Sequence, residues 1–366
     1  MKFEISLPQD IRFGRKCRFD LISQLPEGAV LFVCGKHAKE RIQKEMLPLL
    51  ENRKVLIFSG LSGEPQLSEI EEIIALARPE NIQSVIGWGG GSAMDAAKAA
   101  AALLHEKQPV SEYFYARALA EERQVFFAAL PTTAGTGAEV TANAVLTDEH
   151  TGIKQSLRAP GMAPDLALVD PELVEESPFS VMAASGFDAL TQAIEGFISR
   201  KADALTRGFA RSAVREIFLN LEKACQHEPD AVDAVTLGSL NAGIGLAKSG
   251  LGAVHGVGHP LGSLLHIPHG ICCGTLLVEV LRFNQSVAGG LLNELASSLG
   301  LRDGNQLIQQ IGELRKKLNI PENFKQYHLE RSHFDFIVAN CRSGSMKSNP
   351  REMSDNDVIQ LLEKMI

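Results

Sequence analysis

The feature that most limits how this chain can fold is an alternation of short apolar runs and helical stretches over residues 28–170. The apolar runs are Ala29–Cys34, Val55–Ser59, Ser84–Trp88, Val125–Leu130 and Leu166–Val169. Between them lie Ala38–Glu51, Gln66–Arg78 and Ala93–His105, in which apolar residues recur at helical spacing. Strands and helices that alternate in this way form βαβ units. The pattern predicts an α/β domain whose parallel sheet is covered by helices.

A second domain is expected because the pattern changes after Pro171 and Pro178. Long helical patterns follow, such as Val181–Ile198 and Leu205–Cys225. At 366 residues the chain is also longer than one core usually organises. Proline opposes helix continuation and stiffens connectors, so the proline-rich passage from Pro160 to Pro178 marks the crossing. We therefore predict an α/β domain at 1–177 and an all-α domain at 178–366.

Charge and composition narrow the class of protein. The formal net charge of -8 repels nucleic acid, so we expect a small-molecule ligand and no nucleic-acid partner. No apolar run approaches the roughly 20 residues of a membrane span, and the stretch MKFEISLPQDIRFGR lacks a signal-peptide core. We expect a cytoplasmic protein that does not bind membranes. The six scattered cysteines lack CxxC spacing, which indicates reduced thiols.

A glycine-rich turn, Gly87-Trp-Gly-Gly-Gly-Ser-Ala-Met-Asp95, follows a predicted strand and precedes an alanine-rich helix. Glycines let a backbone approach a pyrophosphate, and the free N–H groups of a helix beginning near Ser92 favour an anion. Ser92 and Asp95 also have capping-box spacing. A tight structural turn explains the three glycines equally well, and the motif is not GxGxxG. A second loop, Pro131 to Glu139, follows the next strand, and two such loops would line one crevice.

Histidines are concentrated in one segment. Four of the ten fall between His255 and His269. His255 and His259 have the i, i+4 spacing of one helical face, and His269 lies at a turn beside Pro268. Upstream, Asp188 and Gln192 have the same i, i+4 spacing. One such histidine is more often a core residue, but a carboxylate with two imidazoles is a plausible site for zinc or ferrous iron.

These motifs together resemble those of the iron-containing (group III) alcohol dehydrogenases, a family with the dehydroquinate synthase-like fold. The resemblance rests on residues 87–98, 131–141 and 188–195 and on the block from His255 to Gly270. It implies a parallel, Rossmann-like N-terminal domain and an all-α metal domain. It also implies a homodimer and hydride transfer between NAD(P)(H) and a small alcohol or aldehyde in the cleft between the domains.

The resemblance assigns roles to the metal-site residues. The family's metal is held by residues that match Asp188, His255 and His269, and its fourth ligand is usually a histidine where this chain has Gln192. We therefore predict Gln192 as a substituted fourth ligand. An amide oxygen is a harder and weaker ligand than an imidazole, so this departure affects the choice between iron and zinc. His259 matches a histidine that lies beside the metal, and we expect it to relay the alcohol proton as the catalytic acid or base.

The resemblance also implies a set of cofactor contacts. The predicted cofactor-binding residues are Gly35, Gly89, Gly90, Gly91, Ser92, Asp95, Thr132, Thr133 and Lys154. Many NAD-specific relatives carry an aspartate after the first strand, where this chain has Gly35 followed by Lys36 and, nearby, Lys39. Without a carboxylate there, nothing repels a 2′-phosphate, so we expect NADP(H) in preference to NAD(H). Both lysines also suit an ordinary solvated surface.

Other interpretations stay open. Lys248 stands where relatives often have Asn, and it is either a solvated lysine or a cation that favours an acidic substrate. A dehydroquinate synthase-like lyase would need several basic groups around its polyanionic substrate, and the second domain offers few. Gln192 also leaves room for a metal-free, degenerate member of the family.

Overall fold

The computed structural model describes residues 7–61, 63–342 and 344–366 of the chain. The stretch MKFEISLPQDIRFGR, for which we expect no signal peptide, begins with residues 1–6, and these lie outside the described residues. The chain forms two compact units. The first comprises the described residues up to Thr133 together with Gly137–Glu176, and the second comprises Ala134–Thr136 together with Ser177–Ile366. The predicted domain boundary at 177/178 remains a prediction.

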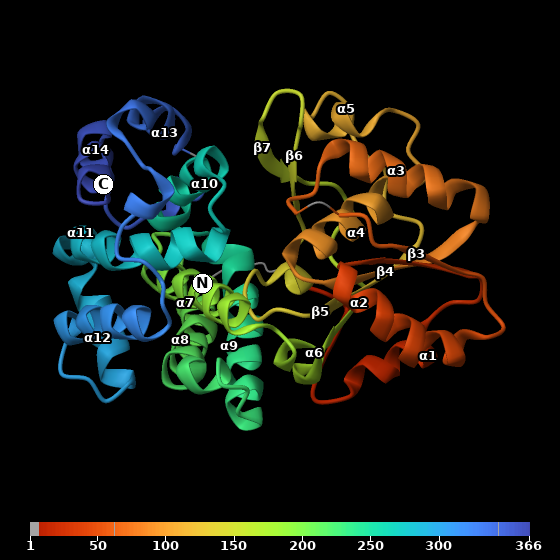
Figure 1. The fold of residues 1–366 in the computed structure, drawn as a ribbon, viewed down its shortest axis with the longest axis horizontal. Helices are drawn as coiled ribbons and strands as arrows, with labels where there is room; N and C mark the ends of the chain where they lie inside the picture. Colours follow the sequence, from red (N-terminus) through yellow and green to blue (C-terminus); the bar gives the residue numbers. More distant parts are fainter. Residues whose placement is uncertain (1–6, 62, 343) are drawn as a thin grey trace. The chain divides into compact units, whose positions relative to one another are not determined.

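The first unit is built on a parallel sheet of six strands (Figure 1). The strands are β1 (Asp10–Phe13), β2 (Ala29–Cys34), β3 (Val55–Phe58), β4 (Ile82–Gly89), β5 (Phe126–Pro131) and β8 (Leu166–Val169). Their order is β1-β8-β5-β4-β2-β3, so β2 has β3 on one side and β4 on the other. The strand order therefore reverses between β2 and β4, which is where open α/β sheets bind ligands. The predicted parallel α/β fold is confirmed.

Apolar side chains on both faces of the sheet bury it between two layers of helices. Leu31 and Val33 of β2 pack on the side of α3 (Leu67–Ala77), α4 (Gly91–Leu103) and α5 (Val110–Phe114). Phe32 belongs to the other core, which includes residues of α1 (Leu21–Gln24) and α6 (Pro171–Glu175) and lies beside α2 (Lys36–Arg41). Figure 1 shows α3, α4 and α5 over one face of the strands, and α1, α2 and α6 over the other. A strand buried on both faces appears as a continuous apolar run in sequence.

Three local features differ from the sequence prediction. The prediction of one continuous helix over Ala38–Glu51 is wrong. Helix α2 leads into a π-helical turn, Ile42–Met46, and then into a 3-10 turn. Pro48 explains the change, because it lacks an N–H and its ring clashes with the carbonyl four residues earlier. The sequence also did not predict β1, or the antiparallel pair β6 (Ala144–Thr147) and β7 (Lys154–Leu157). The sequence of β7, KQSL, has almost no apolar signal.

In the described part of the second unit, the regular elements are all helices (Figure 1). They are α7 (Phe179–Ile198), α8 (Ala204–Ala224), α9 (Pro229–Ser249), α10 (Ala253–Leu265), α11 (His269–Ser298), α12 (Gly304–Lys317), α13 (Phe334–Asn340) and α14 (Asp355–Glu363), with short 3-10 turns between some of them. The predicted all-α second region is therefore confirmed. Among the described residues, no helix combines the length and apolar character that crossing a membrane requires.

Helix α7 is the centre of this unit. It packs against α8, α9 and α11, and every residue from Gly186 to Ser199 is buried. A helix enclosed on all sides is expected to be apolar all round. Yet Asp188, Gln192 and Glu195 are only 3%, 4% and 2% exposed, and their i, i+4, i+7 spacing puts them on one face. This polar stripe needs buried partners, because an unpaired charge in a core is costly.

Gly270, at the start of α11, brings that helix into backbone contact with α7. A Cβ at Gly270 would overlap the carbonyl group of Ala184. Neither side of the contact is a flexible side chain, so neither can move away cheaply. The contact therefore fixes how closely the first turn of α11 approaches α7.

This contact predicts opposite effects for two glycine substitutions in α11. Gly270→Ala should destabilise the protein by about 3 kcal/mol or more, because the helices must move apart. Gly290→Ala is the matched control: its position is exposed, with no atom near the added methyl group. It should stabilise the helix by about 0.5–1 kcal/mol. Urea unfolding measures both, and equal effects would contradict the assigned contact.

Candidate functional site

Four potential ligand side chains of the second unit converge from three helices. Asp188 comes from α7, His255 from α10, and both His269 and Cys273 from α11. One ligand atom from each residue lies within 4.8 Å of the corresponding atom of every other. His255 is 1% exposed and Cys273 is fully buried, whereas the His269 side chain is 29% exposed. The cluster is therefore enclosed on the side of His255 and reachable on the side of His269.

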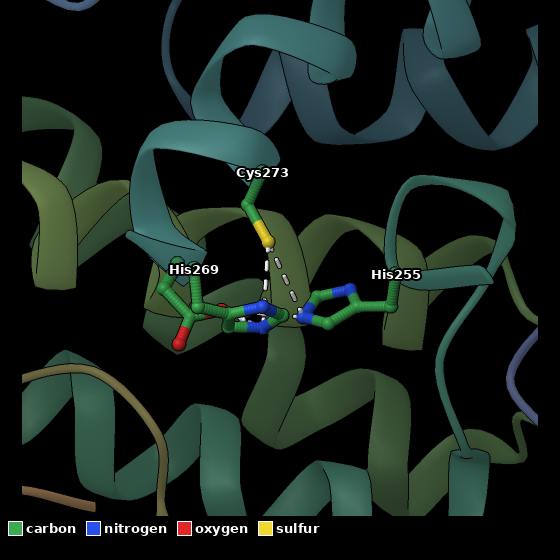
Figure 2. A group of neighbouring side chains, drawn as sticks. His255, His269 and Cys273 are labelled. Carbon is green, nitrogen blue, oxygen red and sulfur yellow. Dashed lines mark hydrogen bonds and ion pairs between the residues drawn. The ribbon is translucent and has the colours of Figure 1, made fainter. Parts of the chain in front are cut away.

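The ligand atoms point at a common centre. Asp188 Oδ1 lies 3.2 Å from His255 Nε2 and 3.6 Å from His269 Nε2. The sulfur of Cys273 lies 3.7 Å from His255 Nε2 and 3.6 Å from His269 Nε2. Figure 2 shows the thiol directed from α11 toward both imidazole rings. A carboxylate, two imidazole nitrogens and a thiol at these separations form a ligand set for a divalent transition metal.

Glu195 holds His255 in this orientation. Its Oε2 lies 2.7 Å from His255 Nδ1, which leaves Nε2 directed at the cluster. The same carboxylate accepts hydrogen bonds from the backbone N–H groups of Gly252 at 2.9 Å and Val254 at 2.7 Å. These donors belong to the N-terminus of α10, where N–H groups lack partners within the helix. Glu195 therefore caps the helix that carries His255 and orients its ring.

Gln192 provides a direct test of whether a metal fits here. Its side chain hydrogen-bonds Asp188, and an amide donates to a carboxylate only through Nε2. Its Oε1 is buried without a hydrogen-bond partner among the described residues. Most buried polar atoms are paired, so an orphaned oxygen next to a ligand cluster indicates an additional group. The donor set and the orphaned oxygen both fit a divalent metal.

The cluster strongly perturbs the proton affinities of its members. Burial opposes charge on each group, but the charges of the others outweigh it. The charge of His269 and the hydrogen bond of His255 lower the pKa of Asp188 to about 2. Cys273, Glu195 and Asp188 raise the pKa of His255 well above 6.5, and the two histidines lower the pKa of the Cys273 thiol. The site thus favours charged ligands, and a bound cation would replace the protons that the imidazoles carry.

His259 lies next to the cluster, one turn after His255 on α10. Its ring stacks on His269 with 5.2 Å between centroids and 28° between planes. Its centroid is 5.9 Å from that of His255. His259 is partly exposed. It therefore lies beside His269, on the reachable side of the site.

Three segments that hold most of the predicted cofactor residues of the first unit lie at the ends of three adjacent strands. Gly35 follows β2, Gly90 follows β4, and Thr132 follows β5. Gly35 N–H donates to Trp88 O at 3.3 Å, and Thr132 N–H donates to Gly89 O at 2.9 Å. A Cβ at Gly89 would lie 2.6 Å from Ala93 Cβ, so glycine is required where β4 meets α4. The three segments thus share the carboxyl edge of the sheet, at its switch point.

The capping box predicted for Ser92 and Asp95 is wrong. Helix α4 starts at Gly91, with Gly90 as its N-cap and no hydrogen bond from a capping side chain. The Asp95 carboxylate instead accepts the N–H of Val145 at 3.0 Å and pairs with the buried Lys98 at 3.6 Å. The absent side-chain cap suits a helix end that binds an anion.

Two lysines singled out from the sequence have acidic neighbours. Lys154, a predicted cofactor contact, pairs with Glu64. Lys248 pairs with Asp203, the N-cap residue of α8, and the pairing lowers the pKa of that carboxyl to about 2. This pairing supports a structural role for Lys248. Lys36 and Lys39 of α2 are exposed.

Two residues of the site were missed in the sequence. Glu195 is seven residues after Asp188 and therefore on the same helical face. Cys273 is four residues after His269, the same spacing that relates Asp188 to Gln192. Helical spacing from an established candidate would have found both. The sequence could not show that α7, α10 and α11 meet.

Known proteins match both units. Residues 8–171 match the model of iron-containing alcohol dehydrogenases, and residues 182–366 match that of the C-terminal region of the Fe-containing alcohol dehydrogenase family. A 1-propanol dehydrogenase from Salmonella typhimurium is 32% identical over 335 residues, with 86% of each chain covered. An NADPH-dependent butanol dehydrogenase from Clostridium saccharobutylicum is 29% identical, with 98% of this chain and 96% of the other covered.

A solved structure matches the whole chain. It is a sulfoacetaldehyde reductase from Bifidobacterium kashiwanohense in complex with NAD+, with a TM-score of 0.92 and 27% identity. The match covers 100% of this chain and 99% of the other.

The geometry around Glu195 predicts that Glu195→Gln weakens metal binding about 10- to 100-fold, because His255 loses its charged acceptor. Competition with a chelator measures the affinity, and circular dichroism checks that the overall helix content is retained. Glu294→Gln is the control, since Glu294 is an exposed residue of α11 paired with Arg211. An unchanged metal affinity in Glu195→Gln would exclude the orienting role.

Proposed function

Because the chain belongs to the iron-containing alcohol dehydrogenase family, we propose that it interconverts small alcohols and aldehydes with NAD(P)(H) through a metal held by Asp188, His255 and His269. The convergence of these three side chains from three helices is the observation that carries the proposal. The family match over both units and the alcohol and aldehyde activities of its relatives support the same reaction.

The residues of the cluster bind and orient the reactants. When bound, the metal supplies a Lewis acid for the substrate oxygen, and the dinucleotide carries the hydride. Asp188 provides negative charge that favours a cation, and Glu195 keeps His255 Nε2 directed at it. The alcohol enters from the side of His269, because His255 and Cys273 are enclosed.

His259 is proposed to transfer the alcohol proton. An imidazole suits this step at neutral pH, and general acid–base catalysis contributes about 10²–10⁴-fold to rates. The ring stacks on His269 and is partly exposed, so it lies close to a bound substrate and can exchange the proton with solvent. In aldehyde reduction the same ring donates the proton.

NADP(H) is proposed as the preferred cofactor. The position after β2 is Gly35, and the exposed Lys36 and Lys39 are close to it in sequence. A 2′-phosphate would meet no carboxylate there and would be attracted by these cations. The pyrophosphate is proposed to bind at the start of α4, which no capping side chain occupies.

Two other interpretations have less support. The lyase reaction requires several cations around a polyanion, and Lys248 is already paired with Asp203. A metal-free member would not need a buried carboxylate, two imidazoles and a thiol around one centre. The homodimer that the family resemblance implies stays a prediction.

The ligand and relay roles predict different outcomes for His255→Ala and His259→Ala. His255→Ala should lose both metal and activity, because it removes a ligand. His259→Ala should keep its metal while kcat falls about 100-fold. Metal analysis and NADPH oxidation with short aldehydes measure both. Full activity and metal content in both variants would contradict the assignment, and a wild type without metal or turnover would refute the proposed function.

The cofactor proposal predicts that Gly35→Asp raises the KM for NADPH about tenfold more than that for NADH, since the new carboxylate repels the 2′-phosphate. The side chain fits, because Gly35 has a φ of -71° and no atom lies within 4 Å of the point that a Cβ would occupy. Gly35→Asn is the isosteric, uncharged control. Equal effects on NADPH and NADH would refute the discrimination.

A further inference from the structure

We propose that Cys273 binds the metal as a thiolate and is its fourth protein ligand, in place of the side chain at position 192. This inference rests on the proposed function, because it concerns the same metal. The family resemblance implies a fourth ligand from the helix that carries Asp188. Here the structure offers one from α11, the helix that carries His269.

The separations between the four ligand atoms support this set. Tetrahedral zinc, with bonds of about 2.0–2.2 Å to nitrogen or oxygen and about 2.3 Å to sulfur, separates oxygen from nitrogen by about 3.4 Å and sulfur from nitrogen by about 3.6 Å. The observed oxygen–nitrogen distances from Asp188 are 3.2 and 3.6 Å. The observed sulfur–nitrogen distances from Cys273 are 3.7 and 3.6 Å. The sulfur already stands where a ligand would.

The backbone holds Cys273 in this position. His269 and Cys273 are i, i+4 in the first turns of α11, so they project from one face. The contact of Gly270 with the Ala184 carbonyl fixes this end of the helix against α7. Figure 2 shows both side chains of α11 converging with His255.

Gln192 has a different role in this arrangement. Its amide donates to Asp188 and so positions that ligand. Its buried Oε1 has no partner among the described residues, an independent indication that the site holds more than side chains. An amide oxygen is also a harder and weaker ligand than a thiolate for a late transition metal. Gln192 thus positions Asp188, and Cys273 completes the ligand set.

A thiolate ligand changes which metal the site prefers. Zinc accepts sulfur, nitrogen and oxygen ligands together, and soft thiolates favour it. Binding forms a metal–sulfur bond and releases the thiol proton to solvent. We therefore expect this chain to bind zinc more tightly than ferrous iron. Cys273→Ser should reduce the ratio of the two affinities.

The test uses the full-length protein loaded with Co²⁺ or Zn²⁺. Wild-type protein with Co²⁺ should show visible d–d bands together with a near-ultraviolet sulfur-to-cobalt charge-transfer band. X-ray absorption of the zinc form should show one sulfur at about 2.3 Å. Cys273→Ser should lose the charge-transfer band and lower zinc affinity about 100-fold or more, which exceeds the usual loss from an outer-sphere change.

Cys272→Ala is the matched control. Cys272 is the neighbouring buried thiol of α11, and its sulfur lies 4.0 Å from the Ile267 carbonyl oxygen, outside the cluster. It should keep both spectra and the zinc affinity.

The outcomes separate the two proposals. Cys273 is not a ligand if the wild-type cobalt protein shows d–d bands without the sulfur-to-cobalt band. The same conclusion follows if Gln192→Ala loses zinc affinity and Cys273→Ser does not. In both cases the proposed function still stands. If wild type binds neither cobalt nor zinc, the metal site of the proposed function fails as well.

Discussion

The second unit depends on one buried carboxylate with three hydrogen bonds. Glu195 accepts two backbone N–H groups at the start of α10 and lies within hydrogen-bond distance of the His255 ring. Hydrogen bonds to a charged group are stronger than neutral ones, and all three are shielded from water. Without that carboxylate, the end of α10 would have buried N–H groups without partners, and His255 could rotate. Fold and site therefore share the same three bonds.

The polar stripe of α7 explains why such a helix can occupy the centre of a core. Glu195 has backbone partners, Asp188 has two imidazoles, and Gln192 has Asp188. Most hydrogen-bond partners of these three buried polar side chains therefore come from other helices. The one exception is Gln192 Oε1, which is buried without a hydrogen-bond partner among the described residues. Buried hydrogen bonds of this kind are costly to break, so they favour one packing arrangement of the helices.

Much of the fold followed from the sequence because it depends on local patterns. Strands β2 and β8 have the predicted ends, and α7 starts two residues before the predicted Val181. The two strands are almost wholly buried, so their residues are continuously apolar, and the apolar residues of α7 recur at helical spacing. The π-helical and 3-10 turns around Pro48 were missed because the local effect of this proline was not taken into account. The polar strand β7 was missed because tertiary contacts override a weak local signal there. The convergence of Asp188 with His255 was inferred only from residue types and a family resemblance. Cys273 was not recognised, although it is four residues after His269, because a buried cysteine commonly acts as a small apolar residue.

The placement of the ligands has a consequence for the order of folding. Asp188 and His255 are 67 positions apart in the chain, so chelation by both would close a long loop in an unfolded polypeptide. The bare chain therefore gains little from an ion until helix packing has brought these segments together. Gly270 and Ala184 bring α11 and α7 together through a close backbone contact, and this contact does not require a bound ion. Metal uptake should accordingly be a late event in biogenesis, acting on a scaffold that is already assembled and slowing its unfolding afterwards.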